Sequence, residues 1–323
     1  MIYNNSIKKI EEYITSGVFP GVSLAFINKG KIDEFYLGQK QIKPYKSPTE
    51  PGLTYDLASV SKVVGVGTLL IRDILAGKLD LDSPLQKYYP AFHNDDLSLG
   101  EFLTHTTGVD PYIPNRDQLN AKELTEAMNN IKITADKSFK YTDVNFLLLG
   151  FMVENLYKDD LASILKREVF DKFGLENTQY GPVDCAVKTS KDVPEGVVHD
   201  PKARLLGRHA GSAGIFSTLK DLEIFVEKYL DDEFDKTYFS GKIKNLDESY
   251  SKQDKKRSLA WDLLDDGWLL HTGYTGTFIM INLREKQGLV FLSNRVHLKD
   301  ERAKWIAERD ELIKIIINDF KNS

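Results

Sequence analysis

The stretch Asp56-Leu-Ala-Ser-Val-Ser-Lys-Val-Val64 organises this chain of 323 residues, because it holds a polar pair at the predicted start of a helix. The pair is Ser59 and Lys62, spaced as Ser-x-x-Lys. The turn-forming residues Pro51-Gly52 lie just upstream, and apolar residues at helical spacing run from residue 63 to 76. The pattern therefore predicts a helix whose N-terminus lies at or near Ser59.

Ser59 and Lys62 are one helical turn apart, so their side chains share one face of the predicted helix. The free amide N–H groups of a first helical turn point toward any oxyanion that forms at Ser59. Lys62 can accept the serine proton if its pKa lies well below that of a free lysine, and burial and the helix dipole both lower it. The alternative is an N-cap serine followed by an exposed lysine, because Ser-x-x-Lys occurs by chance in many helices.

The composition is that of a globular protein with a mild net charge of −5. This charge argues against a nucleic-acid partner, and no basic run contradicts it. One cysteine, Cys185, excludes an internal disulfide, and no His or Cys cluster has metal-site spacing, so we expect no metal and no cofactor. Residues 1–10 lack the apolar core of a signal peptide, and no apolar run reaches membrane-spanning length. The chain as given is predicted to be cytoplasmic, without a membrane partner.

Strand-like runs lie at both ends of the chain, at residues 22–27, 32–37, 268–272, 277–283 and 288–294. Two N-terminal strands alone do not make a stable sheet, so we expect all five to form one antiparallel sheet. Helical patterns near both termini, the first with Ser6 as its predicted N-cap, are expected to cover one face of this sheet.

The middle of the chain has helical patterns, at residues 122–131, 145–157 and 161–173. The predicted fold class is therefore α+β, an α/β sandwich with an inserted all-helical region. Residues 1–56 and 215–323 would form the α/β domain, and residues 57–214 the mainly helical domain. Residues 177–208 have little periodicity, and a connection this long is expected to be functional, for example as part of a site wall.

Two further polar motifs bear on the interpretation of Ser59. Tyr141-Thr-Asp143 precedes an apolar helix, where the phenol can reach a cleft and relay a proton. The alternative is that Thr142 or Asp143 is an N-cap and Tyr141 a packing residue. His271-Thr-Gly273 lies in a predicted strand, where the glycine indicates either close approach by another group or a simple bend.

With Ser59-Val-Ser-Lys62, Tyr141-Thr-Asp143 and His271-Thr-Gly273, the chain resembles the serine β-lactamase and penicillin-binding protein superfamily. It is most similar to the branch of class C β-lactamases, DD-peptidases and penicillin-recognising esterases. The resemblance covers residues 5–320 and implies a β-lactamase/transpeptidase-like fold. Three further stretches also look familial: 103–108, 210–217 and 292–297.

The resemblance implies a role for each matching residue. Ser59 would be the acyl-forming nucleophile, Lys62 its base or a proton relay, and Tyr141 a second acid/base that protonates the leaving group. The backbone N–H groups of Ser59 and Tyr274 would form the oxyanion hole. The predicted substrate-binding residues are Asp143, His271, Thr272 and Gly273.

Two residues depart from the family pattern. Asp143 stands where the family usually has asparagine, and an ionised carboxylate cannot donate to a substrate, unless Asp143 instead pairs with Lys62. His271 stands where β-lactamases have lysine, so a permanent charge for a substrate carboxylate is lost. If His271 becomes charged as the pH falls toward the usual histidine pKa of about 6.5, the affinity for carboxylate ligands is expected to rise.

The first expectation for function is a serine hydrolase that cleaves a small ester or amide through an acyl-enzyme intermediate. The alternative enzyme is a D-alanyl-D-alanine carboxypeptidase or a weak β-lactamase, acting on peptides or β-lactams. The alternative from another class is a penicillin-binding sensor that is acylated once and does not turn over. The presence of Ser59, Lys62 and Tyr141 together favours a working enzyme.

Overall fold

The computed structural model describes residues 3–94, 96–297 and 299–323, so the first two residues of the N-terminal stretch lie outside the described residues. Among these residues the main sheet has seven strands, all antiparallel, in the order β3-β2-β1-β10-β9-β8-β7. Its strands are β1 (Gly21–Asn28), β2 (Lys31–Gln41), β3 (Ser47–Pro48), β7 (Asp262–Leu263), β8 (Trp268–Thr272), β9 (Phe278–Asn282) and β10 (Gln287–Ser293).

The prediction of a five-stranded sheet is therefore corrected to seven strands in the described chain. The five predicted strands correspond to β1, β2, β8, β9 and β10, and the two ends of the chain meet where β1 pairs with β10, from Val22↔Ser293 to Asn28↔Gln287. The two missed strands, β3 and β7, have two residues each and lie at the sheet edges, too short to show an alternating pattern.

Strand β1 is buried on both faces, which explains its continuous apolar sequence. Leu24 and Phe26 point into one apolar cluster, while Ala25 and Ile27 point into another on the opposite face. In the first cluster Phe19 contacts Trp305 edge to face, with ring centroids 5.8 Å apart.

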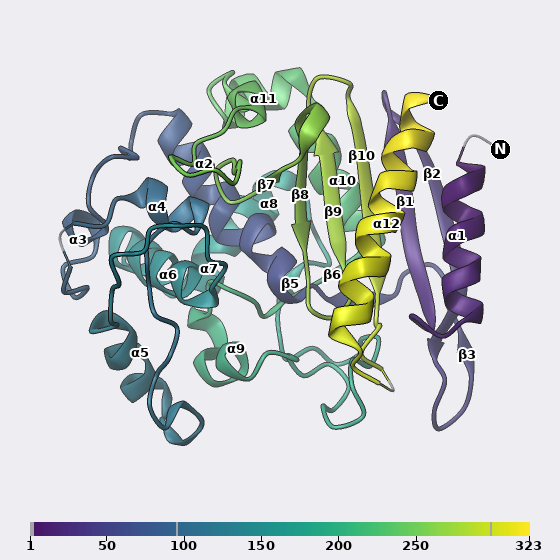
Figure 1. Cartoon of the computed structure of the whole chain (residues 1–323), viewed down its shortest axis with the longest axis horizontal. Coiled ribbons are helices and arrows are strands. Elements are labelled where there is room, and N and C mark those ends of the chain that lie inside the picture. The colour runs from purple at the N-terminus through teal and green to yellow at the C-terminus, as the bar shows by residue number, and fades with distance from the viewer. Residues whose placement is uncertain (1–2, 95, 298) are drawn as a thin grey trace.

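The terminal helices α1 (Asn4–Thr15) and α12 (Arg302–Lys321) lie side by side over one face of the sheet (Figure 1). Helix α10 (Leu219–Leu230) packs against β1 and β10 on the other face. The other helices are α2 (Thr68–Leu75), α3 (Leu85–Tyr88), α4 (Leu99–Thr104), α5 (Ala121–Asn129), α6 (Asp143–Tyr157), α7 (Leu161–Leu165), α8 (Asp171–Phe173), α9 (Pro201–Leu206) and α11 (Asp232–Tyr238).

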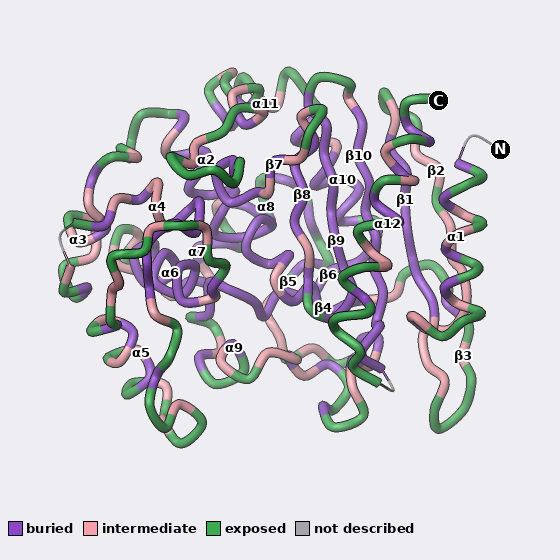
Figure 2. The backbone as a smooth tube through the Cα atoms, viewed as in Figure 1, coloured by how far each residue is buried: buried purple, intermediate pink, exposed green. Residues whose placement is uncertain are grey.

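Helix α6 forms the centre of the helical part of the molecule. Every residue from Val144 to Val153 is buried, as expected for a helix that is apolar all round. Figure 2 shows this buried interior continuing from α6 and α2 into the strands β8 to β10. The division into domains at residues 56/57 and 214/215 stays a prediction.

A second sheet joins the strand-rich and helical parts. Within the described residues it has three antiparallel strands, in the order β4 (Thr54–Asp56), β6 (Ile215–Thr218) and β5 (Gln179–Tyr180). Strand β4 leads directly to Ser59, so this sheet fixes where the first motif begins.

No helix in the described ranges has both the length and the apolar character needed to cross a membrane. The cytoplasmic location stays a prediction.

Candidate active site

Ser59 lies in a short 3₁₀ turn, Ala58–Val60, that is followed by a π-helical turn, Val63–Gly67, and then by α2. The predicted helix start near Ser59 is therefore confirmed, although its first turns are irregular. Ala58 has φ +47°, a conformation that is uncommon for a residue other than glycine. The carboxylate of Asp56 supports it by accepting the Ala58 N–H at 2.8 Å.

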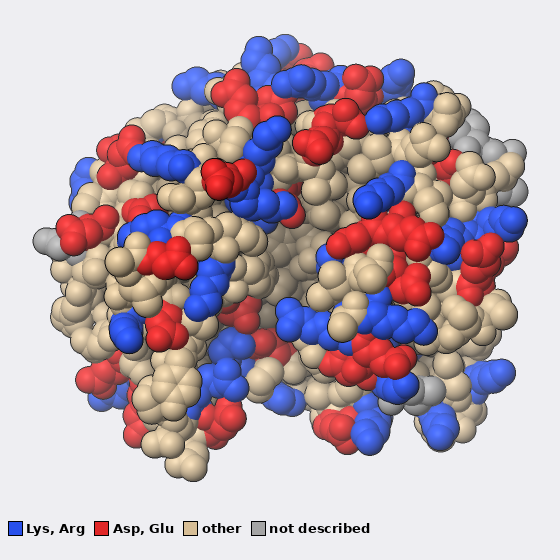
Figure 3. Space-filling view, viewed as in Figure 1, with Lys and Arg blue, Asp and Glu red and all other residues tan. Residues whose placement is uncertain are grey.

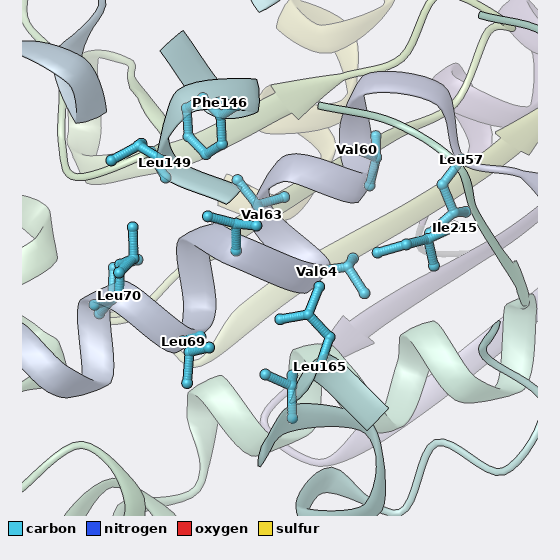
Figure 4. Close-up of a cluster of buried hydrophobic side chains, with 14 of the residues drawn as sticks. Leu57, Val60, Val63, Val64, Leu69, Leu70, Phe146, Leu149, Leu165 and Ile215 are labelled. Carbon is cyan, nitrogen blue, oxygen red and sulfur yellow. The ribbon is translucent and has the colours of Figure 1, made fainter. Parts of the chain in front are cut away.

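Apolar side chains hold this segment in place (Figure 4). Val60, Val63 and Val64 are fully buried and belong to the same cluster as Phe146 of α6 and Ile215 of β6. A nucleophile on a segment packed this densely is held in one position relative to its neighbours.

Lys62 is fully buried, and its Nζ makes three hydrogen bonds. It donates to Ser59 Oγ at 3.0 Å, to Asp143 Oδ1 at 2.8 Å and to the Ser212 carbonyl at 2.8 Å. An ammonium has three protons, so these acceptors use every donor that it has.

The condition that the Lys62 pKa lies well below its usual value is not met in the resting site. Burial is the largest single influence and lowers the pKa of Lys62, but Asp143 and Tyr141 together outweigh burial and raise this pKa above the usual lysine value. The same pairing holds the pKa of Asp143 well below its usual range against the effect of burial. In the resting enzyme Lys62 is therefore a cation that donates to Ser59.

The second motif meets the first at the start of α6. Thr142 is the N-cap of this helix, with its hydroxyl accepting the Val144 N–H at 3.3 Å, as one of the two interpretations of this motif expects. The Tyr141 side chain is 42% exposed, and its ring centroid lies 5.1 Å from Lys62 Nζ. It is a ring at the cleft surface directly above the buried lysine.

His105 supports Tyr141 from behind, with ring centroids 4.6 Å apart. Its Nδ1 lies 3.0 Å from Asn145 Nδ2, which donates to it. Burial, with the charges of Arg257 and Lys62, lowers the pKa of His105 well below its usual value, so the ring is neutral. His105 lies in the stretch at residues 103–108 that resembles the family, so the sequence indicated that this residue matters. Nothing in that stretch indicated that His105 contacts Tyr141.

Lys202 is a site residue that the sequence did not reveal. Its Nζ lies 3.1 Å from Asp143 Oδ2 and 3.2 Å from Asp200 Oδ2, so Asp143 is paired with two lysines. The Asp200-Pro201 pair, with its N-cap aspartate and a proline at the first helical position, is a helix-start signal that could have identified α9. No sequence pattern indicates that α9 approaches Asp143.

The third motif lies in and after β8. His271 is 4% exposed, and in the described part of the chain neither of its ring nitrogens has a hydrogen-bond partner. Burial, with the charges of Lys62 and Arg257, lowers the pKa of His271 well below its usual value. His271 therefore stays neutral near pH 6.5, because burial disfavours a charged imidazole, and the condition for better carboxylate binding in weak acid is not met.

The loop after His271 is fastened to the Ser59 turn. The Thr277 hydroxyl donates to the Leu57 carbonyl at 2.9 Å, and the Thr275 hydroxyl donates to the Asp56 carbonyl at 3.0 Å. A Cβ on Gly273 would lie 2.6 Å from the Leu57 carbonyl oxygen, so only glycine fits. The close approach that this glycine indicates in the sequence is confirmed.

A cavity of about 470 Å³ opens at Ser59, a size that suits a small-molecule substrate. Figure 3 shows a hollow between the helical part and the sheet, with charges of both signs around its rim. The cavity is lined by residues of the 177–208 stretch and of the connection between α4 and α5, including Pro111, Ile113, Arg116, His199, Asp200, Pro201 and Lys202. The expectation that residues 177–208 contribute to a site wall is confirmed.

The structure brings some predicted site residues to this cavity and places others behind it. Ser59, Tyr141, Asp143 and Tyr274 line it. Lys62 is buried behind Ser59, and the lining does not include His271, Thr272 or Gly273. The exposed Cys185 lies elsewhere, and its pKa is raised by Glu195, as expected for an unreactive thiol.

Known proteins share this arrangement of elements. The family model described as Beta-lactamase matches residues 7–313. A putative D-alanyl-D-alanine carboxypeptidase from Escherichia coli O157:H7 is 25% identical over 360 aligned residues, covering 91% of this chain and 82% of that protein.

Two solved structures show the same fold. A beta-lactamase/D-alanine carboxypeptidase from Pseudomonas syringae is 18% identical, with a TM-score of 0.77 and 98% of both chains covered. A class C beta lactamase from Rhodobacter sphaeroides is 18% identical, with a TM-score of 0.74, and 97% of this chain and 99% of that chain are covered. The predicted β-lactamase/transpeptidase-like fold is confirmed.

Proposed function

We propose that this chain, which belongs to the beta-lactamase family and is a serine hydrolase, cleaves small esters or amides through an acyl-enzyme at Ser59. The observation that carries the proposal is the hydrogen bond from the buried Lys62 to Ser59 Oγ, at the floor of a cavity that Tyr141 also lines. Nucleophile, cation and phenol are thus in place without any rearrangement of the backbone.

In this mechanism the Ser59 oxygen attacks the substrate carbonyl. For the attack Lys62 first releases one proton to solvent, and the neutral amine then takes the proton of the Ser59 hydroxyl. Tyr141 gives its phenolic proton to the leaving group and regains a proton from the Lys62 ammonium, so the serine proton ends on the leaving group. Water then attacks the acyl-enzyme, with the same groups acting in reverse.

The carbonyl oxygen becomes an oxyanion during attack and needs N–H donors. We assign this role to the backbone N–H groups of Ser59 and Tyr274, since both residues line the cavity and threonine side chains fasten their segments together. Asp143 has both oxygens paired with lysines, so we assign it to holding Lys62. The third motif would then contribute to substrate binding through its backbone and through the shape that it gives the cleft, and not through a charge. Its residues are His271, Thr272 and Gly273.

A neutral ester or amide is the preferred substrate in this proposal, because His271 supplies no charge for a carboxylate. The test is a panel of p-nitrophenyl esters, D-amino-acid amides and the chromogenic cephalosporin nitrocefin, with Ser59→Ala as the control. Multiple turnovers with an ester or amide, lost in Ser59→Ala, support the proposal. A stoichiometric burst without turnover would instead support the penicillin-binding sensor.

One observation favours a D-alanyl-D-alanine carboxypeptidase as the second candidate. Arg257 is 3% exposed, lies over the Phe139 ring at 5.2 Å, and its Nε has no hydrogen-bond partner among the described residues. It pairs with Asp262 at 3.6 Å and does not line the cavity, but its charge still lowers the pKa values of His105 and His271. In this second candidate the buried guanidinium supplies part of the positive charge that His271 lacks.

The two candidates differ in their need for a substrate carboxylate. An acyl-D-alanyl-D-alanine peptide and its C-terminal amide should be compared in wild type and in Arg257→Met. If only the peptide with a free C-terminal carboxylate is hydrolysed, and Arg257→Met loses this activity, the carboxypeptidase candidate is supported. Equal rates on acid and amide favour the neutral-substrate hydrolase.

A further inference from the structure

Two lysines share the carboxylate of Asp143, one on each oxygen. Lys62 Nζ lies 2.8 Å from Oδ1, and Lys202 Nζ lies 3.1 Å from Oδ2. We propose that Lys202 is a positioning residue that acts through Asp143 and sets how readily Lys62 releases a proton. This inference rests on the proposed function, in which Lys62 serves Ser59.

The need for such a residue follows from the surroundings of Lys62. It is fully buried, and all three of its protons are donated, one of them to Asp143. A carboxylate whose whole charge acted on Lys62 would make the ammonium too stable to give up a proton at neutral pH. A second cation on the other oxygen cancels part of that attraction.

Lys202 is placed to supply this second cation. It lies in the first turn of α9, on the cavity wall, with its side chain 17% exposed. Asp200, the N-cap of the same helix, lies 3.2 Å from its Nζ and accepts the Ala203 N–H at 2.8 Å. Asp200 and Asp143 therefore compete for Lys202, and a change at either one alters how strongly Lys202 acts on Asp143.

Other charged or titratable groups also face Lys62. The Tyr141 ring lies above Lys62. The neutral His105 and His271 lie close enough for the charge of Lys62 to lower their pKa values, and the charge of Arg257 also lowers them. Among the described residues, however, the ion pairs of Asp143 are those with Lys62 and Lys202. Lys202 is thus the group that can be changed without touching Ser59, Lys62 or Tyr141.

The test is the rate at which a fluorophosphonate labels Ser59, measured from pH 6 to pH 10, where Lys62 is mostly a cation and the rate follows its small neutral fraction. In Lys202→Met the uncompensated Asp143 should hold the Lys62 proton more tightly, and the rate should fall by about tenfold at each pH, the effect of one pKa unit. In Asp200→Asn, which keeps an N-cap side chain, Lys202 acts on Asp143 alone, so the rate should rise at each pH. Lys202→Arg keeps the charge and should restore a rate close to wild type.

Lys244→Met is the matched control, since Lys244 is exposed and is not among the residues that line the cavity. Opposite changes of the labelling rate in Lys202→Met and Asp200→Asn support the inference, and any other pattern overturns it. If Lys202→Met does not fold, the direction of the rate change in Asp200→Asn decides. Labelling of Ser59 at an unchanged rate in both variants rejects the role of Lys202 alone, whereas absence of labelling at Ser59 rejects the proposed function itself.

Discussion

The two walls of the cleft handle buried polar groups in opposite ways. On the helical wall, Lys62 is a cation with every proton donated, and the carboxylate of Asp143 is shared with Lys202. On the sheet wall, His271 is equally buried but neutral, with neither ring nitrogen paired in the described chain. Burial alone therefore does not decide charge, because a partner at hydrogen-bond distance reverses its effect.

This difference indicates where the charge for catalysis comes from. The sheet wall contributes backbone, held against the Ser59 turn by Thr275 and Thr277, and one cavity-lining cation, Arg302 of α12. The helical wall contributes the charged groups next to Ser59. Catalytic activity should then be sensitive to charge changes on the helical wall. On the sheet wall, proton uptake by His271 should instead affect the stability of the fold.

The largest expected effect is on the helical wall itself. Lys62→Ala should lose nearly as much activity as Ser59→Ala, on the order of 10⁴-fold or more, and the double variant should be little worse than either. Lys62→Arg should not rescue, because a guanidinium keeps its proton. Ester hydrolysis by the four variants is the measurement, and additive losses would mean that Lys62 only supports the helix.

Tyr141→Phe tests whether the exposed phenol belongs to the helical wall's chemistry. We expect kcat to fall by roughly 10²–10⁴-fold, the usual contribution of a positioned acid or base. The ring packing against His105 is preserved, so the urea unfolding midpoint should stay near wild type. An unchanged kcat would return Tyr141 to a packing role.

Asp143→Asn removes the carboxylate from the buried lysine. Because Lys62 then keeps a buried charge without its partner, the free energy of unfolding should fall by about 3 kcal/mol at pH 7, the lower end for a broken buried pair because Asp143 is partly exposed. Urea denaturation measures this, with Asp232→Asn, at an exposed ion pair with Lys286, as a control that should behave like wild type. Equal stability of both variants would show that the buried pair contributes little.

The smallest effect is expected on the sheet wall. The pKa of His271 is depressed in the folded state, so below pH 6.5 the unfolded chain binds a proton that the folded chain does not, and stability is lost as pH falls. Between pH 7.5 and 5.5 this proton uptake should lower the free energy of unfolding of wild type by about 1.4 kcal/mol. The His271→Gln variant should not show this loss. The same pH dependence of stability in His271→Gln as in wild type would mean that His271 is charged in the folded protein.

Much of the fold could be predicted, because long apolar patterns fix long elements. Residues 268–272 are predicted as a strand and form β8 with the same bounds, and the helix predicted at 145–157 is α6. Short elements could not be predicted, since the two-residue edge strands have no period. Ser6 was also assigned wrongly, because α1 begins at Asn4 and the Ser6 hydroxyl instead donates to Asp319 at 2.8 Å.

The motif residues of the site were found from the sequence, but their electrostatics were not. The pKa of Lys62 depends on Asp143, 81 residues away, and the neutrality of His271 depends on burial by distant segments. Lys202 lies in a stretch without periodicity, and its contact with Asp143 exists only in the folded chain. The spacing of residues along the sequence predicts which side chains meet on one helix or strand. The charge state of a side chain also depends on the charges and the burial that other helices and strands supply.

The most direct test of the central claim is the site of covalent labelling. The intact protein should be treated with a fluorophosphonate, digested and analysed by peptide mass spectrometry, alongside Ser59→Ala. We predict a single adduct on the peptide that carries Ser59, absent from the variant. An adduct on Cys185, or labelling that persists in Ser59→Ala, would contradict the assignment of Ser59 as the nucleophile.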